Sequence, residues 1–549
     1  MAVYQPQTSR IQIKAFGEED NFIIFAPFFN LSLKMRKIYF LLLTLFSLLT
    51  LGACERGTKV IYGMRVEEHI GVAYDAADGA FEYTLHSAVD PATVTVSATV
   101  NGGASWITSV DVKPNVNSGK GRVSFSLEQN DSKLSRTATI TLSATAHQTQ
   151  SIKITQFGTP TEEANHTLMF LFLGTSLNRY FDTNIDDAKK AIMTGILGDS
   201  NRVLLFRQDN MIKAHISELC YDTTTKMCIE RRVVENITLP SSQLTAEELA
   251  SLINTMIAEA PAQRYGIVLA GHGTAWLPRD VVNNNKSSVS TLGAYHNVWT
   301  PAPGAEVTRT YGERDNVHFN IPELATALDQ LDVDFDYILF DACFMSNIES
   351  IYDLRNSANY IIASPCEIMG RGFPYERTLP HLIVDNGMTT NYIKAGESYY
   401  KFYRDEYTNQ ARSGSIAVIN CNEIDALADA TKSVLESMST GYYNRNSLQT
   451  YEGQDIHYFF DFGEWISIVA TDNAALEAFN AQFNKTVIAK YSLDTFYSAY
   501  GSYGTHAINL DVYSGITTSA PTEADIYGYM LETNWCKYVW SEKAKEVVE

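Results

Sequence analysis

Two residues of this sequence have the chemistry and the neighbours of a nucleophile and its base. His272 stands between two glycines, directly after the apolar run 265–270. Cys343 comes about seventy residues later and follows a second, mostly apolar run, 336–340. A cysteine thiolate is a strong nucleophile, and a histidine within hydrogen-bonding reach can hold it as an ion pair and later protonate a leaving amine. Together they would cleave an amide bond through a thioester.

Each residue alone is a weak signal. A lone buried cysteine is usually a small apolar filler, and a Gly-His-Gly turn is usually a tight connection between two elements. The joint pattern is stronger because each residue follows a strand-like run. The pair becomes a candidate site if the fold brings these two strand ends together.

The chain from residue 167 onward alternates apolar, strand-like runs with amphipathic helical segments. The expected strands are 168–173, 203–206, 265–270, 337–340 and 360–363, and the expected helices are 185–197, 246–257, 321–331 and 348–354. This alternation predicts a mainly parallel α/β sheet with helices on both faces, in which chemistry gathers at the carboxyl ends of the strands. His272 and Cys343 would meet there, and Ser346 or Asn347 would cap the helix that follows.

Residues 73–158 show a different pattern, in which apolar and polar residues alternate along short runs. The expected strands are 81–85, 93–100, 122–127, 137–142 and 151–157. Such alternation, with turn residues between the runs, is typical of a small all-β, immunoglobulin-like sandwich with half-buried strands. The region carries no paired carboxylates and no cluster of metal-ligand residues, so we expect no catalysis in it.

The N-terminal region has the pattern of a secretory signal. Residues 35–37 (MRK) are a short positive run, and residues 38–51 are mostly apolar. A bilayer-spanning helix needs about twenty residues, so this stretch is too short to span and fits the apolar part of a signal peptide. Residues 51–54 (LGAC) resemble a bacterial lipobox, which implies that Cys54 is lipidated. A buried helix or an uncleaved anchor is the alternative, and residues 1–34 are interpreted as a mis-assigned extension.

The composition excludes several classes of protein. Of 549 residues, 45% are hydrophobic and 19% are charged, which excludes a disordered, collagen-like or polytopic membrane protein. The 63 acidic residues outnumber the 42 basic ones and give a net charge of −21, which disfavours nucleic-acid binding. Seven cysteines are too few for a disulfide scaffold. Cys220 and Cys228 could form a bridge in an exported protein, but nothing in their spacing requires one.

The combined pattern of strand, Gly-His-Gly, strand and Asp-x-Cys resembles the clostripain (C11) family of cysteine peptidases, in the clan of caspases, legumains and gingipains. The matching segments are 169–173, 269–276 (LAGHGTAW), 340–349 (FDACFMSNIE), 361–364 and 372–375 (GFPY). The resemblance implies a caspase-like fold. It also implies that His272 is the general acid and base, that Cys343 is the nucleophile, and that the amides of Gly273 and Cys343 form the oxyanion hole. Each such donor contributes about 3 kcal/mol to catalysis.

The resemblance also implies a substrate preference. Asp341 matches the acid at the base of the family's S1 pocket, which selects Arg or Lys because a buried carboxylate pairs with a cationic side chain. Glu367 is expected to add a second negative wall to this pocket, unless Arg371 neutralises it. Cys366 matches no family role and is expected to be a packing residue. The predicted substrates are proteins or peptides with basic residues.

Family members are often made as zymogens that are cleaved between the histidine and cysteine strands. The stretch 277–317 is long, polar and turn-rich, as a processing loop would be. Cleavage is expected after Arg279, Lys286, Arg309 or Arg314, by the enzyme itself or by a relative. Some family members also need calcium, but the sequence contains no EF-hand-like loop and by itself requires neither a metal nor another cofactor.

The predicted sandwich resembles a BACON domain in the segments 105–107 (SWI), 136–140 (RTATI) and 152–158 (IKITQFG). That resemblance implies contact with a glycan or mucin, and a plain spacer is the alternative. The expected parts of the chain are the extension and signal at 1–54, the sandwich at 55–158, a linker at 159–166, the peptidase core at 167–380 and a C-terminal α/β subdomain at 381–549.

The sequence therefore predicts an exported cysteine endopeptidase, anchored by lipid in the envelope of a Gram-negative bacterium, at the outer membrane or the cell surface. Two alternatives stay open. The α/β domain could be an inactive scaffold in a surface adhesin or glycan-binding lipoprotein. The same dyad could also transfer the acyl group to an amine and make a new peptide bond.

Overall fold

The computed structural model describes most of the chain from residue 62 to residue 540. The gaps in this range are residues 68, 87–89, 102–103, 116, 132–135, 159–162, 199, 241–243, 279–304, 310–318, 384–388, 408–411, 439–442, 455–456, 501–505, 522–529 and 531. The predicted signal with Cys54 lies outside the described residues, and so do three of the predicted processing sites, Arg279, Lys286 and Arg314.

The N-terminal part of the described chain is a two-sheet β-sandwich. Its strands are β1 (Gly63–Val66), β2 (His69–Val72), β3 (Asp78–His86), β4 (Val96–Asn101), β5 (Ile107–Pro114), β6 (Lys120–Leu127), β7 (Arg136–Ala144) and β8 (Gln150–Gln156), and a short 3-10 helix, η2 (Pro91–Thr93), precedes β4. One sheet has the order β1-β3-β6-β5, and β2, β8, β7 and β4 are neighbours in the other. Val123, Ile140 and Ile152 are completely buried between them. The alternating runs thus form the expected strands, with their apolar positions inward.

The larger part of the chain is built on one mixed sheet. Its strands are β9 (Ala164–Phe172), β10 (Asn201–Asn210), β11 (Lys213–Asp222), β12 (Met227–Thr238), β13 (Ala262–Ala270), β14 (Phe335–Asp341), β15 (Ala358–Ala363), β16 (Ile416–Asn420) and β18 (Val487–Tyr491). The order is β18-β16-β15-β14-β13-β9-β10-β11-β12. Strands β10, β9, β13, β14 and β15 are parallel, whereas the pairs outside them are antiparallel. The predicted α/β sheet is confirmed, with antiparallel additions at both ends.

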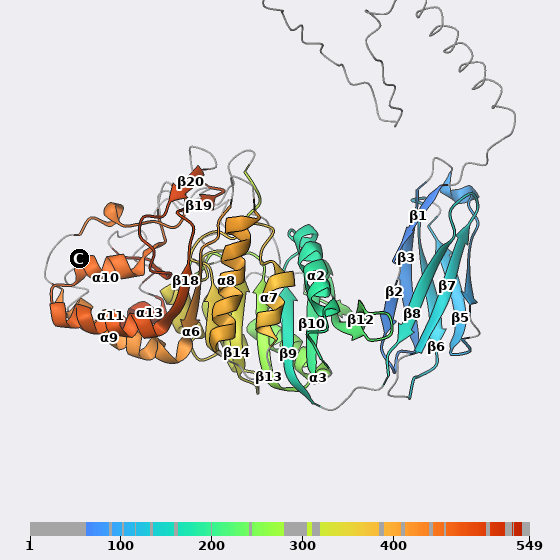
Figure 1. Ribbon diagram of the computed structural model, residues 1–549, viewed down its shortest axis with the longest axis horizontal. Helices are drawn as coiled ribbons and strands as arrows, with labels where there is room; N and C mark the ends of the chain where they lie inside the picture. Colours follow the sequence, from blue (N-terminus) through green and yellow to red (C-terminus); the bar gives the residue numbers. More distant parts are fainter. Residues whose placement is uncertain are drawn as a thin grey trace, which may run out of the picture. The chain divides into compact units, whose positions relative to one another are not determined.

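Helices cover both faces of this sheet. They are α2 (Asn178–Met193), α3 (Ala246–Glu259), α5 (Ile321–Asp329), α6 (Ile348–Leu354), α7 (Tyr375–Leu382), α8 (Thr389–Asp405), α9 (Ile424–Ser437), α10 (Phe462–Val469), α11 (Asn473–Thr486) and α13 (Asn534–Val539). Helices α2, α7 and α8 contact one another in series (Figure 1), and α3, α5, α6, α13, α9 and α11 form a second connected series. Asn347 caps α6 by accepting from the amide of Ser350 at 3.2 Å, which is one of the two caps predicted.

The C-terminal region shares its hydrophobic core with the central sheet. One cluster of buried residues runs from Ala164 to Trp540. The remaining short elements are β17 (Phe460–Asp461), β19 (Thr495–Ser498), β20 (His506–Asn509), β21 (Thr517–Thr518), η3 (Cys421–Glu423) and η4 (Arg445–Ser447). Aromatic side chains of this region, including those of Tyr399 and Tyr458, are buried. They therefore pack the core rather than form an exposed platform.

Cys220 and Cys228 lie on the neighbouring antiparallel strands β11 and β12 and are both free thiols. In the register of this pair, Cys220 is opposite Ile229 and Cys228 is opposite Tyr221. Successive side chains of a strand point to opposite faces, so the two cysteines lie on different faces of the sheet. The disulfide between Cys220 and Cys228, which the sequence allowed but did not require, is not formed. Across the described ranges, no helix is long and apolar enough to cross a membrane.

Candidate active site

The two predicted catalytic residues follow neighbouring parallel strands. Ala270 at the end of β13 pairs with Asp341 at the end of β14, and His272 and Cys343 each come two residues later. Gly273 packs directly on the nucleophile: a Cβ atom on Gly273 would lie 2.6 Å from the carbonyl oxygen of Cys343 and 3.3 Å from its amide nitrogen. A residue larger than glycine would therefore push the two loops apart.

The loop that carries Cys343 is fixed on both sides. Cys343 is completely buried, and the amide of Ile368 donates to its Sγ at 3.0 Å. Phe344 has a left-handed backbone, with φ of 61°, and its ring stacks on Phe459 at 4.5 Å between centroids. The hydroxyl of Ser346 donates to the carbonyl of Gly515 at 2.6 Å. The C-terminal region thus holds the strained turn that positions the sulfur.

The imidazole of His272 contacts a hydroxyl group that the sequence did not suggest. Oγ of Ser176, in the loop between β9 and α2, lies 2.8 Å from Nε2 of His272. A serine hydroxyl can donate to a neutral imidazole or accept from a protonated one, so this contact suits both states of a general acid and base. The contact fixes the ring, whose second nitrogen, Nδ1, is also buried.

We expect Ser176→Ala to lower kcat roughly tenfold with little change in KM, because an imidazole that is not held contributes less of its general acid and base effect. Ser176→Thr keeps the hydroxyl and is the matched control. A Ser176→Ala enzyme with the kcat of wild type would rule out this positioning role.

A segment from the loop between the two strand ends occupies the site. We call residues 305–309 the strap. It pairs with residues 368–370 as an antiparallel strand: the amide of Arg309 donates to Ile368 at 2.7 Å, and the amide of Gly370 donates to Val307 at 2.6 Å. At the far end, the amide of Glu306 donates to the hydroxyl of Tyr497 at 2.8 Å. This is how an extended peptide adds to the edge of a protein's sheet.

The carbonyl of Arg309 lies where two amides converge. The amide of Gly273 donates to its oxygen at 3.1 Å and the amide of Cys343 at 3.5 Å. These are the two amides that the family resemblance predicts as the donors of an oxyanion hole. An oxyanion hole needs two or more preorganised donors aimed at one oxygen of the reacting bond. The strap therefore places the carbonyl of Arg309 where the reacting carbonyl of a bound substrate would lie.

The side chain of Arg309 fills a closed pocket. It forms a fully buried ion pair with Asp341, with Nη1 2.9 Å from Oδ2. The same oxygen accepts from the hydroxyl of Tyr375 at 2.8 Å and from the amide of Phe373 at 3.3 Å. Burial raises the pKa of Asp341, although the guanidinium and these two donors act in the opposite direction. Gly372 has a φ of +65°, and a Cβ there would collide with the guanidinium.

Glu367 is also fully buried but lies outside the pocket that holds the guanidinium of Arg309. Its carboxylate accepts from the hydroxyl of Thr308 at 2.8 Å, from the amide of Ala499 at 3.1 Å and from the hydroxyl of Ser498. The prediction that Glu367 lines the S1 pocket is therefore wrong here. Neighbouring side chains of an extended segment point to opposite sides, so a carboxylate that faces Thr308 does not also face Arg309.

Two further expectations concern the residues around Glu367. Arg371 does not neutralise it, because the guanidinium of Arg371 forms an ion pair with Asp187 instead. Cys366 is completely buried, and burial raises the pKa of its thiol, as for a packing residue.

The structure adds two polar residues that sequence reasoning missed, Ser176 and Asn184. Asn184 lies on α2, is completely buried and accepts from Nη2 of Arg309 at 2.7 Å. A polar residue in an amphipathic helix usually faces the solvent, so the residue type alone did not predict that Asn184 is buried in the site. The available signal was its place in the helix, one residue before Ile185 on the side that faces the core.

The calcium implied by the resemblance finds no fitting ligands in the described part of the chain. No three His, Cys, Asp or Glu side chains gather there into a group that could hold a metal ion. Two acidic residues within α2 are engaged in ion pairs: Asp182 pairs with Arg207, and Asp187 pairs with Lys190 and Arg371. We therefore assign no catalytic step to a metal.

Two protein-family models match parts of the chain. Residues 297–541 match the model of the clostripain family, and residues 91–157 match that of the BACON domain, a putative binding domain. None of the curated proteins compared with the chain matches it.

Three solved structures cover most of the chain. A secreted C11 cysteine protease of Bacteroides thetaiotaomicron, iotapain, is 30% identical and covers 70% of this chain and 100% of its own, with a TM-score of 0.58. An inactive zymogen C11 protease of Parabacteroides distasonis is 25% identical, with the same coverage and a TM-score of 0.56. A further secreted C11 protease of B. thetaiotaomicron, in complex with an irreversible peptide inhibitor, shares the fold at 24% identity, with 68% and 99% coverage and a TM-score of 0.56. The chain thus belongs to the clostripain (C11) family of cysteine peptidases.

Proposed function

We propose that this chain is an exported endopeptidase that cleaves after basic residues through Cys343 and His272, and that its own strap keeps it inactive until the bond between Arg309 and Thr310 is cut. The observation that carries the proposal is the strap itself. Its Arg309 presents a carbonyl to two converging amides and a guanidinium to a buried carboxylate. That is the pose of a substrate, formed by the enzyme's own chain.

The reaction follows from these contacts. The thiolate of Cys343 attacks the carbonyl carbon of Arg309, and the oxyanion is stabilised by the amides of Gly273 and Cys343. His272 gives a proton to the amine of Thr310, which leaves as a new N-terminus. The thioester on Cys343 is then hydrolysed by water that His272 deprotonates, which frees the carboxylate of Arg309 and restores the thiol and the imidazole. Other substrates would bind in the same way once the strap has left.

Asp341 gives the proposal a dependence on pH. Burial raises the pKa of its carboxyl, so Asp341 takes up a proton at a higher pH than an exposed aspartate does. The neutral acid no longer pairs with a cation, and we expect kcat/KM for arginine substrates to fall as the pH drops through that pKa. Asp341→Asn is expected to lose this acid limb together with most of its activity on arginine. An unchanged limb in Asp341→Asn would assign the titration to another group.

The proposal is tested by profiling the residue before the cut on a peptide library, with Cys343→Ala as the blank. We expect hydrolysis only after basic residues. Cleavage after acidic or apolar residues, or equal rates in the blank, would contradict the assignment. Adding an amine and looking for ligated product separates hydrolysis from peptide-bond formation.

We further propose that the protein is exported and carries a lipid anchor on Cys54. We also propose that the BACON-like sandwich binds a glycan or mucin. These proposals are supported by the signal-like sequence at 35–54 and by the match of residues 91–157 to a putative binding domain. The family's secreted members, such as iotapain, are consistent with an extracellular or cell-surface location. Membership of a peptidase family and the substrate-like strap disfavour an inactive adhesin. The boundaries that we propose between the signal, the sandwich, the linker, the peptidase core and the C-terminal subdomain fall after residues 54, 158, 166 and 380.

A further inference from the structure

We propose that Asn184 makes the S1 pocket selective for arginine over lysine. This inference rests on the proposed function, because it concerns the same pocket. The charge of Asp341 alone would attract either cation, so a preference between them has to come from the number and the direction of the hydrogen bonds that the pocket offers.

The pocket surrounds the guanidinium of Arg309 with acceptors, and each of its three nitrogens donates to at least one of them. Nε donates to the carbonyl of Gly370 at 3.3 Å. Nη1 donates to the backbone carbonyl of Asp341 at 3.1 Å and lies 2.9 Å from its carboxylate. Nη2 donates to Oδ1 of Asn184 at 2.7 Å and to the carbonyl of Gly370 at 3.2 Å. Four hydrogen bonds and one ion pair thus engage the guanidinium, which carries five N–H donors in a fixed fork.

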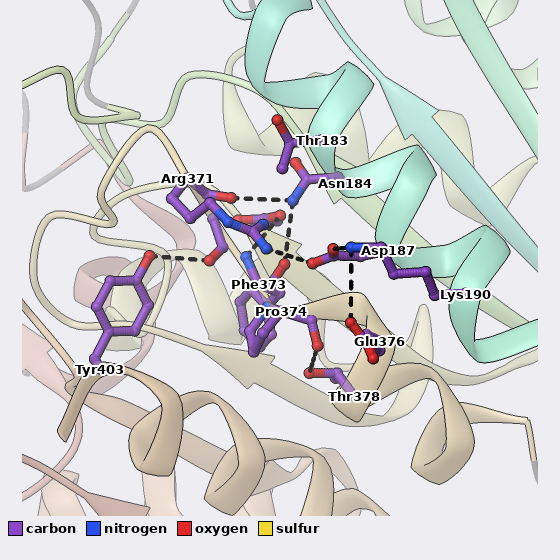
Figure 2. Close-up of polar contacts among 12 residues, drawn as sticks. Thr183, Asn184, Asp187, Lys190, Arg371, Phe373, Pro374, Glu376, Thr378 and Tyr403 are labelled. Carbon is purple, nitrogen blue, oxygen red and sulfur yellow. Dashed lines mark hydrogen bonds and ion pairs between the residues drawn. The ribbon is translucent and has the colours of Figure 1, made fainter. Parts of the chain in front are cut away.

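Asn184 is held so that its oxygen, and not its nitrogen, faces the guanidinium. Its Nδ2 donates to the carbonyls of Arg371 at 3.0 Å and Phe373 at 3.1 Å, as Figure 2 shows. Both hydrogens of the amide are thereby used, which leaves Oδ1 as the acceptor inside the pocket. The amide orientation is therefore fixed by the backbone before any substrate arrives.

The segment that orients Asn184 is itself secured. The guanidinium of Arg371 forms an ion pair with Asp187 from the next turn of α2 (Figure 2). The hydroxyl of Tyr403 donates to the carbonyl of Gly372 at 2.9 Å. The acceptor is thus carried by a helix and braced by a second helix, α8, so it cannot move to follow a shorter or differently shaped side chain.

A lysine in this pocket would leave acceptors without a donor. Its ammonium has three N–H groups on one atom, which cannot reach Asp341, Asn184 and Gly370 with the spread of a guanidinium. Arg309 and Asn184 have no exposed surface, so water cannot replace the missing donors. A site built for hydrogen bonds rejects a ligand that leaves its buried polar groups unpaired. We expect kcat/KM for arginine to exceed that for lysine by about a hundredfold.

The test compares kcat/KM for two peptides that differ only in having arginine or lysine before the cut. The concentration of active, self-cleaved enzyme is measured by titration of Cys343. In Asn184→Ala, kcat/KM for arginine is expected to fall at least about tenfold while the value for lysine changes little, so the ratio collapses. Thr183→Ala, an exposed neighbour on the same helix, is the matched control and is expected to keep the wild-type ratio. Asn184→Asp is the second variant if the alanine variant does not fold. It keeps the size and an acceptor oxygen but cannot donate to the carbonyls of Arg371 and Phe373. Its added charge attracts either cation, so the ratio of arginine to lysine is expected to fall.

The outcomes separate the two claims. Absence of any hydrolysis that depends on Cys343 would refute the proposed function. Hydrolysis that depends on Cys343 but has similar rates for arginine and lysine in wild type would refute only the selectivity. A wild-type ratio that survives in Asn184→Ala, or a parallel loss on both peptides, would assign the selectivity to other groups.

Discussion

Arg309→Ala is expected to leave the purified chain in one piece under conditions in which wild type is cut in two. The alanine keeps the backbone of the strap but removes the side chain that anchors it, along with the partner of the buried carboxylate of Asp341. An unpaired buried charge costs several kcal/mol, so the strap no longer settles in the pose that presents its carbonyl for attack. Gel analysis and the intact mass of both proteins measure the effect.

The other processing residues provide the controls for this experiment. Arg279→Ala, Lys286→Ala and Arg314→Ala are each expected to be cut as wild type is, and the new N-terminus is expected to be Thr310. Arg404→Ala, an exposed arginine far along the chain that pairs with Asp405, controls for the loss of a cation. If Arg309→Ala were cut at the normal rate, the strap would not be the processing site.

Cys343→Ala is expected to lower the rate of peptide hydrolysis by roughly 10⁴-fold or more, because the nucleophile and its base act as a unit. His272→Ala is expected to have a similar effect, and the double variant is expected to be no worse than either. Neither chain is expected to cut itself. The rates are measured on a peptide with arginine before the cut. Wild type and variants are first cut between Arg309 and Thr310 by added active enzyme, which is then removed completely.

Cys421→Ala is the matched control for the loss of a thiol. Cys421 is also buried, and burial raises the pKa of its thiol to about 12, so it is an inert cysteine in the same sheet region. We expect its activity to match that of wild type. A Cys343→Ala or His272→Ala enzyme within tenfold of wild type would end the assignment of the dyad.

Much of the central fold could be predicted because its signals are local. The predicted helix 348–354 matches α6 residue for residue, and the apolar runs 265–270 and 337–340 lie within β13 and β14. These strands are buried on both faces, which produces continuous apolar runs. Two of the antiparallel strands, β12 and β18, were missed for the opposite reason. β12 alternates buried and partly exposed residues, and β18 is only half buried, so neither has a continuous run.

The candidate site was predictable only in part. His272 and Cys343 follow strand ends, and parallel topology brings such ends together. Glu367 was placed in the wrong pocket because distance along the chain from the nucleophile does not tell which way a side chain points. Ser176 and Asn184 come from the first loop and helix, far from both motifs, and act through contacts that only the folded chain creates. The four processing residues were all basic and could not be ranked by type; Arg309 is the one that lies among the described residues, where it pairs with Asp341.

Breaking one bond does not by itself empty the groove. The hydrogen bonds of Glu306, Val307 and Arg309 all lie on the N-terminal side of the bond that is cut, so none of them is lost on hydrolysis. The freed carboxylate end of Arg309 stays tethered to the rest of the chain and competes with incoming peptides at an effective concentration on the order of millimolar. If the proposed cut occurs, the newly cut enzyme is therefore inhibited by its own first product. Its activity is expected to lag behind the cut until that end is trimmed or displaced.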